Sequence, residues 1–213
     1  MIIKKLKFHQ FLFSIIISLL FSNCSKNDEI VELKSSESAS KSTSTLNATT
    51  ITTYTTYLIR TGQHYCDQST IKSVKTSEMK FVARFDSSAI YQSINPINQL
   101  DINKLYGFSE GLNNQYNSAR MGWRWSDGAL RLFGYVYKLG VRYSQEITSV
   151  PFNSDITCSI KLSGSNYIIT ANGISVTLPR GLNTSTATGY QQYPYFGGDE
   201  VAPHNITIQI RNL

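Results

Sequence analysis

Arginine and aromatic residues alternate with apolar residues between residues 118 and 142. Arginine makes paired hydrogen bonds to carboxylate or sulfate groups, and the rings of Tyr and Phe stack on the apolar faces of sugars. A sheet face that carries both types of residue would therefore suit an acidic polysaccharide. The residues that we predict to bind such a ligand are Arg120, Arg124, Arg131, Phe133, Tyr135, Tyr137 and Arg142.

Other interpretations of this face stay open at the level of sequence. Arg and Tyr are ordinary residues on the solvent side of a strand, because the Arg stem covers apolar surface, and a loop such as 180–200 could cover the patch. A third arrangement turns Trp123 and Trp125 toward the ligand instead. Arg124 directly opposite Arg131 is unfavourable by itself, so we expect a buried acid, a bound anion or water to compensate the two charges.

A histidine and a tyrosine are adjacent at His64 and Tyr65. Such a pair can serve as base and acid in β-elimination from a uronate, while an Arg or Gln neutralises the carboxylate. We keep His64 and Tyr65 as catalytic candidates beside the alternative that they are structural. His204 begins the last predicted strand, where we expect a cap or turn role. Glycoside hydrolysis needs two carboxylates in one cleft, and no alternating acidic pattern of that kind occurs.

Two adjacent acids, Asp199 and Glu200, lie in a Gly-rich stretch near the C-terminus. Carboxylate oxygens are ligands for Ca²⁺, so Asp199 and Glu200 are candidate metal ligands; the alternative is a turn that leads into the last strand. A zinc site would need both His64 and His204 together with carboxylates, and their spacing does not indicate one. The sequence predicts no cofactor.

Three cysteines occur in the chain. Cys24 follows the apolar leader, which leaves Cys66 and Cys158 as a candidate pair. A disulfide is compatible with an exported protein. Cys158 alternates with Ile156 and Ile160 and is predicted to point inward, which suits either a buried disulfide or a buried thiol.

Whether the arginine and tyrosine side chains share one sheet face depends on the register of a β-hairpin. The turn residues and the alternation of apolar and polar residues define that register. Asp127-Gly128 is the preferred pair for a two-residue type I′ turn, and it places Trp123 opposite Leu132 across the ladder. A one-residue slip would mix the apolar and polar faces. A second turn at Leu139-Gly140 then sets Arg142 opposite Tyr137, Ser144 opposite Tyr135 and Glu146 opposite Phe133.

Period-two alternation recurs at 79–85, 156–162, 174–178 and 206–211. Such alternation predicts antiparallel strands with one buried face. We expect about ten strands and at most one short helical turn, at 101–108. The fold class is therefore all-β, an antiparallel β-sandwich of the jelly-roll or concanavalin-like kind. The predicted core comprises Phe81, Phe85, Trp123, Trp125, Leu132, Ile160, Val176 and Ile208.

The N-terminus reads as a targeting segment followed by a tether. Three lysines precede an apolar stretch from Phe11 to Phe21, which is typical of a signal peptide, and Cys24 follows. This arrangement resembles a bacterial lipoprotein signal over residues 1–23, which implies acylation of Cys24 and attachment to a membrane. Residues 24–50 are rich in Ser and Thr and predict a flexible tether. Residues 51–213 form the predicted β-sandwich domain.

The amino-acid composition excludes some classes of protein and of binding partner. The 213 residues hold 20 Lys and Arg against 14 Asp and Glu, a formal net charge of +6, and 16% of the residues are charged while 12% are aromatic. These values exclude a coiled coil and an acidic disordered chain. Because no run of Lys or Arg follows the leader, we predict no nucleic-acid partner.

Residues 118–137 and 195–210 resemble surface lipoproteins of Bacteroidota with a concanavalin-like or jelly-roll domain. That resemblance implies an outer-membrane or cell-surface location and a lectin-like, carbohydrate-binding function. A structural or adhesive protein that binds other proteins is the alternative, and a polysaccharide lyase is a further one. The sequence holds neither an Arg-x-Glu strand nor a Gln-Ile-His motif of the alginate-lyase type.

Overall fold

A computed structural model describes residues 53–213. The predicted signal segment, the predicted tether and Cys24 lie outside the described residues. Within the described part, the chain forms twelve strands and two short 3-10 helices. They are β1 (Thr55–Ile59), β2 (Ser73–Thr76), β3 (Glu78–Phe85), η1 (Ser87–Ala89), η2 (Pro96–Leu100), β4 (Asn103–Ser109), β5 (Asn117–Ser126), β6 (Ala129–Lys138), β7 (Val141–Val150), β8 (Ile156–Ser163), β9 (Asn166–Ala171), β10 (Ile174–Pro179), β11 (Ala187–Gln192) and β12 (Ile206–Asn212).

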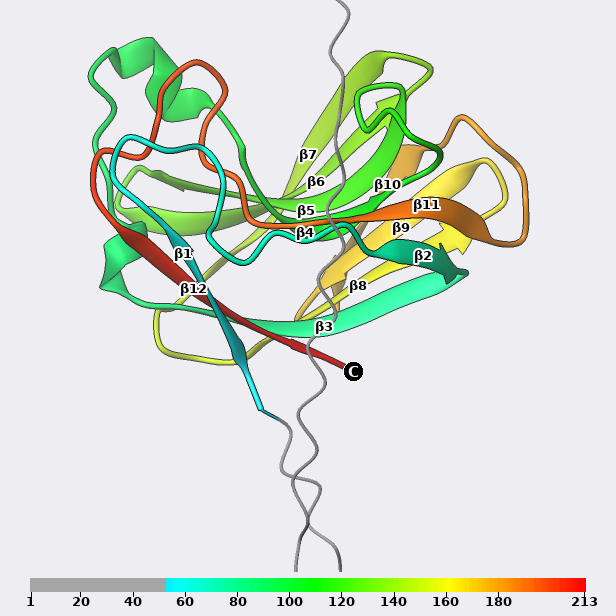
Figure 1. Cartoon of the computed structure of the whole chain (residues 1–213), viewed down its shortest axis with the longest axis horizontal. Coiled ribbons are helices and arrows are strands. Elements are labelled where there is room, and N and C mark those ends of the chain that lie inside the picture. The colour runs from blue at the N-terminus through cyan, green and yellow to red at the C-terminus, as the bar shows by residue number, and fades with distance from the viewer. Residues whose placement is uncertain (1–52) are drawn as a thin grey trace, which may run out of the picture. The chain divides into compact units, whose positions relative to one another are not determined.

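The strands form two six-stranded antiparallel sheets that pack face to face (Figure 1). Sheet A has the order β1-β12-β3-β8-β9-β10, and sheet B has the order β2-β11-β4-β5-β6-β7. Figure 1 shows sheet B curved, so that the face turned away from sheet A is hollow. The described residues thus form an antiparallel jelly-roll β-sandwich, which confirms the predicted fold class.

The predicted hairpin register is confirmed. Trp123 lies opposite Leu132, and Arg124 lies opposite Arg131. The turn residue Asp127 has a φ of 53° and the following glycine a φ of 70°, which a type I′ turn requires at both central positions. The next hairpin also has the predicted pairs, with Arg142 opposite Tyr137, Ser144 opposite Tyr135 and Glu146 opposite Phe133. One irregularity in that ladder, between Leu132 and Phe133, did not show in the pattern.

The core lies between the two sheets and contains the predicted residues with one exception. Phe81, Phe85, Trp123, Leu132, Ile160, Val176 and Ile208 are buried. Trp125 is only partly buried and packs at the margin of the core against Phe152, with ring centroids 5.7 Å apart. Trp123 packs inside against Phe85 and Tyr91, so the arrangement with Trp123 in a ligand groove does not occur.

The helical turn expected at 101–108 is wrong. Residues Asn103–Ser109 form β4, a central strand of sheet B in which every residue is buried. The 3-10 turn comes earlier, at η2, where the Asn95 side chain accepts a hydrogen bond from the Ile97 amide and Pro96 occupies the first helical position. Burial on both faces removed the alternation that would have identified the strand.

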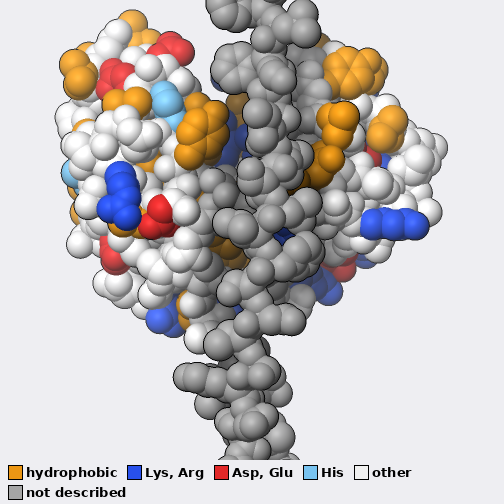
Figure 2. Space-filling model, in the orientation of Figure 1, with side chains coloured by type: hydrophobic (Ala, Val, Ile, Leu, Met, Phe, Trp, Pro, Cys, Tyr) orange, Lys and Arg blue, Asp and Glu red, His pale blue; other side chains and the backbone are white. Residues whose placement is uncertain are grey.

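In the described part of the chain, no helix is long and apolar enough to span a membrane. Lys and Arg side chains are scattered over the part of the domain surface that is visible in Figure 2. Three further cationic side chains, Lys104, Arg120 and Arg142, line a cavity on sheet B.

Candidate functional site

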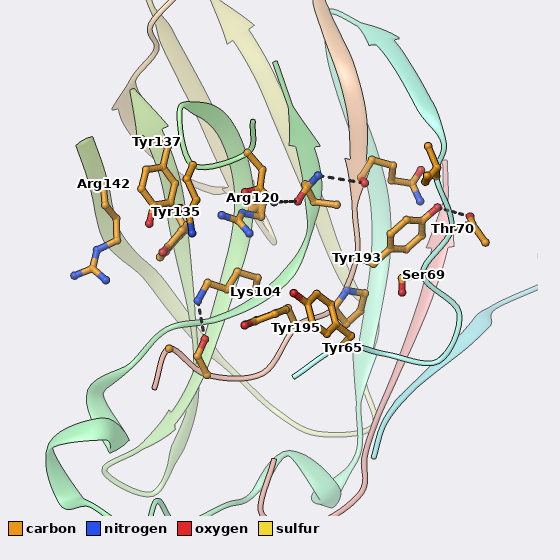
Figure 3. A pocket seen from close by; sticks show the side chains of 18 of the residues that line it. Tyr65, Ser69, Thr70, Lys104, Arg120, Tyr135, Tyr137, Arg142, Tyr193 and Tyr195 are labelled. Atoms are coloured by element: carbon orange, nitrogen blue, oxygen red, sulfur yellow. Dashed lines mark hydrogen bonds between the residues drawn. The ribbon is translucent and has the colours of Figure 1, made fainter. Parts of the chain in front are cut away.

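A cavity of about 570 Å³ occupies the hollow face of sheet B. Strands β4, β5 and β11 supply its floor. Strands β6 and β7 supply one side, and the segments 65–71 and 193–199 supply the opposite wall (Figure 3). The second wall segment is held in place by backbone hydrogen bonds in both directions between Lys104 and Tyr195, each 2.9 Å long. The loops therefore continue the sheet and deepen its hollow.

Arg120 projects from β5 into this cavity, although only 7% of the residue's surface is exposed to solvent. Its guanidinium carbon lies 5.1 Å from the centroid of the Tyr135 ring, a cation–π contact. The Nε atom of Arg120 is buried and has no hydrogen-bond partner. Burial lowers the pKa of Arg120, because a charge in this place has lost much of its water without gaining an acid.

Lys104 projects from β4 beside Arg120 and is also buried, with 9% exposure. Its Nζ donates a hydrogen bond of 2.7 Å to the Gly197 carbonyl oxygen, and it lies 5.2 Å from the Tyr135 ring and 5.4 Å from the Tyr195 ring. Burial, and after it the charge of Arg120, lowers the pKa of Lys104 to about 8. Two cations thus share one poorly hydrated pocket.

Tyr135, Tyr137 and Arg142 form the opposite side of the cavity (Figure 3). The two tyrosine rings are 5.9 Å apart and meet edge to face. Burial raises the pKa of Tyr135 to about 12, so this hydroxyl is neutral and can donate a hydrogen bond. Arg142 is exposed and lies on the neighbouring edge strand β7.

Tyrosines also line the loop wall. Tyr195 makes an edge contact with Tyr65, with centroids 4.9 Å apart, and the Tyr193 hydroxyl is hydrogen-bonded to Thr70 Oγ1 at 3.0 Å. Tyr65 is 67% exposed and lines the cavity. The site therefore combines a cationic floor with aromatic walls on both sides.

The two catalytic candidates are separated by this wall. Tyr65 lines the cavity, whereas His64 does not. His64 stacks on the ring of Tyr195, with centroids 5.1 Å apart and planes 9° apart, and its Nδ1–H donates to the Phe196 carbonyl oxygen at 2.9 Å. His64 is thus a structural support of the wall, and the structure does not bring the pair together in the cavity.

Three of the predicted ligand-binding residues lie on the expected sheet face but outside the cavity. Arg124 donates to the Leu100 carbonyl oxygen at 2.8 Å and covers the buried Phe133 ring at 4.8 Å. Arg131 is paired with Glu146 at 2.9 Å. The carbonyl of Leu100 and the carboxylate of Glu146 therefore compensate the repulsion between Arg124 and Arg131. Arg120, Tyr135, Tyr137 and Arg142 do come together.

Sequence reasoning missed Lys104 and Tyr195. Lys104 pairs with Gly122 across the ladder, on the same face as Arg120, and assignment of 103–109 as a strand next to β5 would have found it. Tyr195 belongs to an irregular segment that lies beside β4 through a single bridge. No local pattern indicates that bridge.

Of the two candidate calcium ligands, Glu200 is engaged in hydrogen bonds to a neighbouring loop. Both carboxylate oxygens of Glu200 accept hydrogen bonds of 2.8 Å from backbone amides, those of Ile94 and Asn95, and these bonds lower the pKa of Glu200. Asp199 lines the cavity rim. No group of three or more His, Cys, Asp or Glu side chains that could hold a metal occurs among residues 53–213. Glu200 is an anchor for the loop before η2.

His204 and the two cysteines are also structural. His204 Nε2–H donates to the Ser88 carbonyl oxygen at 2.8 Å, which fixes η1 to the segment before β12. Cys66 and Cys158 are buried free thiols, so of the two alternatives the buried thiol describes them and the candidate disulfide is not formed. Burial raises the pKa of Cys158 to about 12.

Comparisons with known proteins identify no family. No family model matches the chain, and no curated protein matches it. Among solved structures, the alginate lyase AlyC3 aligns with a TM-score of 0.50 and 8% identity, over 74% of this chain and 72% of that one. A family 7 alginate lyase, A1-II′, aligns with a TM-score of 0.47 and 10% identity over 74% and 76%.

The carbohydrate-binding module CBM66 from Bacillus subtilis aligns with a TM-score of 0.35 and 8% identity, over 69% of this chain and 82% of that one. At these identities the likeness concerns the fold. The alignment with AlyC3 agrees with the jelly-roll sandwich derived from the strand order.

Proposed function

We propose that this domain binds an acidic polysaccharide in the cavity of sheet B. One observation carries the proposal: Arg120 is buried at the cavity floor with an unpartnered Nε. Lys104 and Arg142 add two further positive charges, and Asp199 is the single carboxylate among the lining residues. A carboxylate or sulfate group on a polysaccharide would supply an anionic partner for the guanidinium group of Arg120.

The energetic reason is the cost of burying a charge. A buried cation without an acceptor is destabilising, and a hydrogen-bonded anion offsets that cost. Arg also binds a carboxylate or sulfate through two parallel bonds, which orients the ligand. The anionic group of one sugar unit would therefore lie between Arg120 and Lys104.

The walls are suited to the rest of a sugar chain. Exposed Tyr65 and the ring of Tyr137 offer faces or edges for stacking on pyranose rings, while Asn114 and Gln191 offer amide groups that can bond hydroxyls. The volume lies within the range of roughly 300–1,000 Å³ typical of small-ligand sites. The fold likeness agrees with this proposal, since AlyC3 is named an alginate lyase.

The alternatives lack a comparable observation. A lyase with His64 as base would need that imidazole in the cavity, and the imidazole lies behind Tyr195. A flat or covered sheet face would favour an adhesive role in which the domain binds other proteins, and this face carries a cavity instead. The proposal also includes the location: Cys24 is acylated and holds the domain at the outer membrane or cell surface, an inference supported by the sequence pattern alone.

Calorimetric titration against a uronate-rich and a neutral polysaccharide tests the binding proposal. The unmodified chain should bind the acidic polymer preferentially, and more weakly as salt is added. Arg120→Gln should reduce affinity about tenfold or more, because a hydrogen bond to a charged group contributes about 1.5–3 kcal/mol.

Arg124→Gln is the matched control. It removes an arginine from the neighbouring position of the same strand face, but Arg124 lies outside the cavity. Affinity should then remain close to that of the unmodified chain. Equal affinity for both polymers, or an Arg120→Gln variant that folds and binds normally, would refute the proposal.

A further inference from the structure

Strand β7 is an unusually long free edge. It forms one border of sheet B and has ten residues, Val141–Val150. The other three edge strands are shorter, with five residues in β1, four in β2, and six in β10, which ends in Pro179. Native proteins protect sheet edges with short strands, Lys or Pro. Strand β7 contains neither Lys nor Pro and is exposed from residue 141 to residue 146. Its two charges, Arg142 and Glu146, are of opposite sign, and its ladder irregularity comes after Glu146.

The geometry of the preceding turn defines which backbone groups β7 leaves free. Leu139 and Gly140 both have positive φ, 50° and 84°, so the hairpin has a two-residue type I′ loop. In such a hairpin the flanking residues Lys138 and Val141 form a hydrogen-bonded pair, and the pairs then alternate. The amide and carbonyl groups of Arg142, Ser144 and Glu146 therefore point to the free edge.

We infer that β7 pairs antiparallel with β7 of a second copy of this chain, with Ser144 on the two-fold axis. In this register, Arg142 of each copy lies directly opposite Glu146 of the other, and Ser144 lies opposite itself. Glu146 accepts a hydrogen bond from Arg131 of its own copy through Oε1, so its Oε2 is the oxygen that faces Arg142 of the second copy. All three residues with outward-pointing amides then belong to hydrogen-bonded pairs. Registers centred on Arg142 or on Glu146 would instead place like charges opposite each other, which is unfavourable.

Exposed apolar groups on the other face of β7 support this pairing. Val141 is 53% exposed and Tyr143 is 39% exposed. A second strand in this register places Gln145 of one copy opposite Tyr143 of the other and covers part of both rings. The regular ladder of β7 with β6 extends to Glu146, before the irregularity, so the whole segment from Arg142 to Glu146 can pair.

The pairing has a consequence for the cavity. Arg142 lines the cavity and lies on the pairing edge, so the two cavities of a dimer lie on one continuous sheet, near the axis. If each cavity binds a glycan as proposed, one polymer can occupy both sites of the dimer. The second site then sees a high effective concentration of polymer, which raises the overall affinity. The pairing itself does not depend on the glycan proposal, because only backbone and side chains of β7 form it.

Site-specific crosslinking tests the register. In the full chain with Cys24→Ser, the remaining native thiols, Cys66 and Cys158, are buried. Ser144→Cys should give a covalent dimer with a short bismaleimide, because the two thiols meet at the axis. Ser73→Cys is the matched control, since it places an exposed thiol on β2, the opposite edge of the same sheet, and should not crosslink.

Charge reversal tests the complementarity. Arg142→Glu alone and Glu146→Arg alone should each abolish the Ser144→Cys crosslink, and the double reversal should restore it. Lys75→Glu on β2 makes the same change in net charge as Arg142→Glu and should leave the crosslink intact. Circular dichroism would show whether each variant is folded.

Three results would overturn the inference. One is the absence of a Ser144→Cys crosslink together with monomers in sedimentation equilibrium of the unmodified chain at every accessible concentration. Another is a crosslink that persists unchanged in both single reversals. The last is a folded double reversal that does not recover the crosslink.

Discussion

Lys104 shows at the scale of one residue how the cavity departs from an ordinary protein surface. Its ammonium group is surrounded by tyrosine rings and by one carbonyl, and Arg120 is a second cation beside it. Folding therefore places two positive charges where neither is fully solvated. Such an arrangement opposes stability and is found at binding sites, where a ligand supplies the missing charge.

The lowered pKa of Lys104 leads to a prediction for stability against pH. In the unfolded chain Lys104 keeps its usual pKa of 10.5, and in the folded protein its pKa is about 8. Between these values the unfolded state binds more protons, so the contribution of Lys104 to the free energy of unfolding increases with pH. The full effect is at most about 3 kcal/mol, since one pKa unit corresponds to about 1.4 kcal/mol.

Urea unfolding of the unmodified chain and of Lys104→Met over this pH window provides the measurement. Tyrosines and other lysines contribute equally to both proteins, so the difference between the two curves isolates Lys104. Lys104→Met should be more stable than the unmodified chain below the folded pKa, and this advantage should shrink as the pH rises. Parallel curves would mean that Lys104 is not desolvated in solution.

At the scale of elements, a buried ion pair joins the two sheets. Glu110 follows β4 of sheet B, and Arg180 follows β10 of sheet A. Arg180 Nε and Nη2 donate to the two Glu110 carboxylate oxygens, each at 2.7 Å, and Tyr167 of β9 donates to the same carboxylate. Both charged residues are almost inaccessible to solvent. This contact fixes one end of β4, the strand that carries Lys104.

Removal of one member of this pair should be strongly destabilising. Glu110→Gln leaves the Arg180 charge buried without its counter-ion, and such a change costs about 3–5 kcal/mol. The double variant Glu110→Gln/Arg180→Met should lose less than the sum of the two single variants, because no unpaired charge remains. Denaturant unfolding of the four proteins gives this coupling free energy; an additive result would contradict the assignment of a buried pair.

At the scale of the whole molecule, the start of the described chain and the cavity belong to different sheets of the sandwich. The described chain enters at the foot of β1, on the sheet A side, while the cavity opens on the free face of sheet B (Figure 1). The β7 pairing extends sheet B at its edge and leaves the face with the cavity uncovered.

Acylation of Cys24 is a prediction for the whole chain. Metabolic labelling with a fatty-acid probe should tag the protein in a bacterial host with a lipoprotein pathway, and Cys24→Ala should abolish the tag and release the protein from the membrane fraction. Cys66→Ala serves as the control, because Cys66 is a buried thiol in the folded domain. An unlabelled, soluble unmodified protein would contradict the lipoprotein prediction.

The sequence by itself determined the sandwich class and the two hairpins of sheet B. Asp127-Gly128 and Leu139-Gly140 are turn pairs whose φ values a two-residue loop requires. The alternation around them then assigns each side chain to a face, with Arg124 opposite Arg131 as expected. These are local properties, because a turn and a period of two involve only neighbouring residues.

Only the tertiary structure decided which part of that face is open. Alternation assigns Arg120 and Arg124 to the same side, but it does not specify what covers them. The carbonyl of Leu100 binds Arg124, whereas Lys104 and Tyr195 leave space above Arg120. The covering groups come from segments distant in sequence, as do the contacts that remove His64 from the cavity and leave Cys66 unpaired. Such contacts depend on the packing of the whole chain, which no local period encodes.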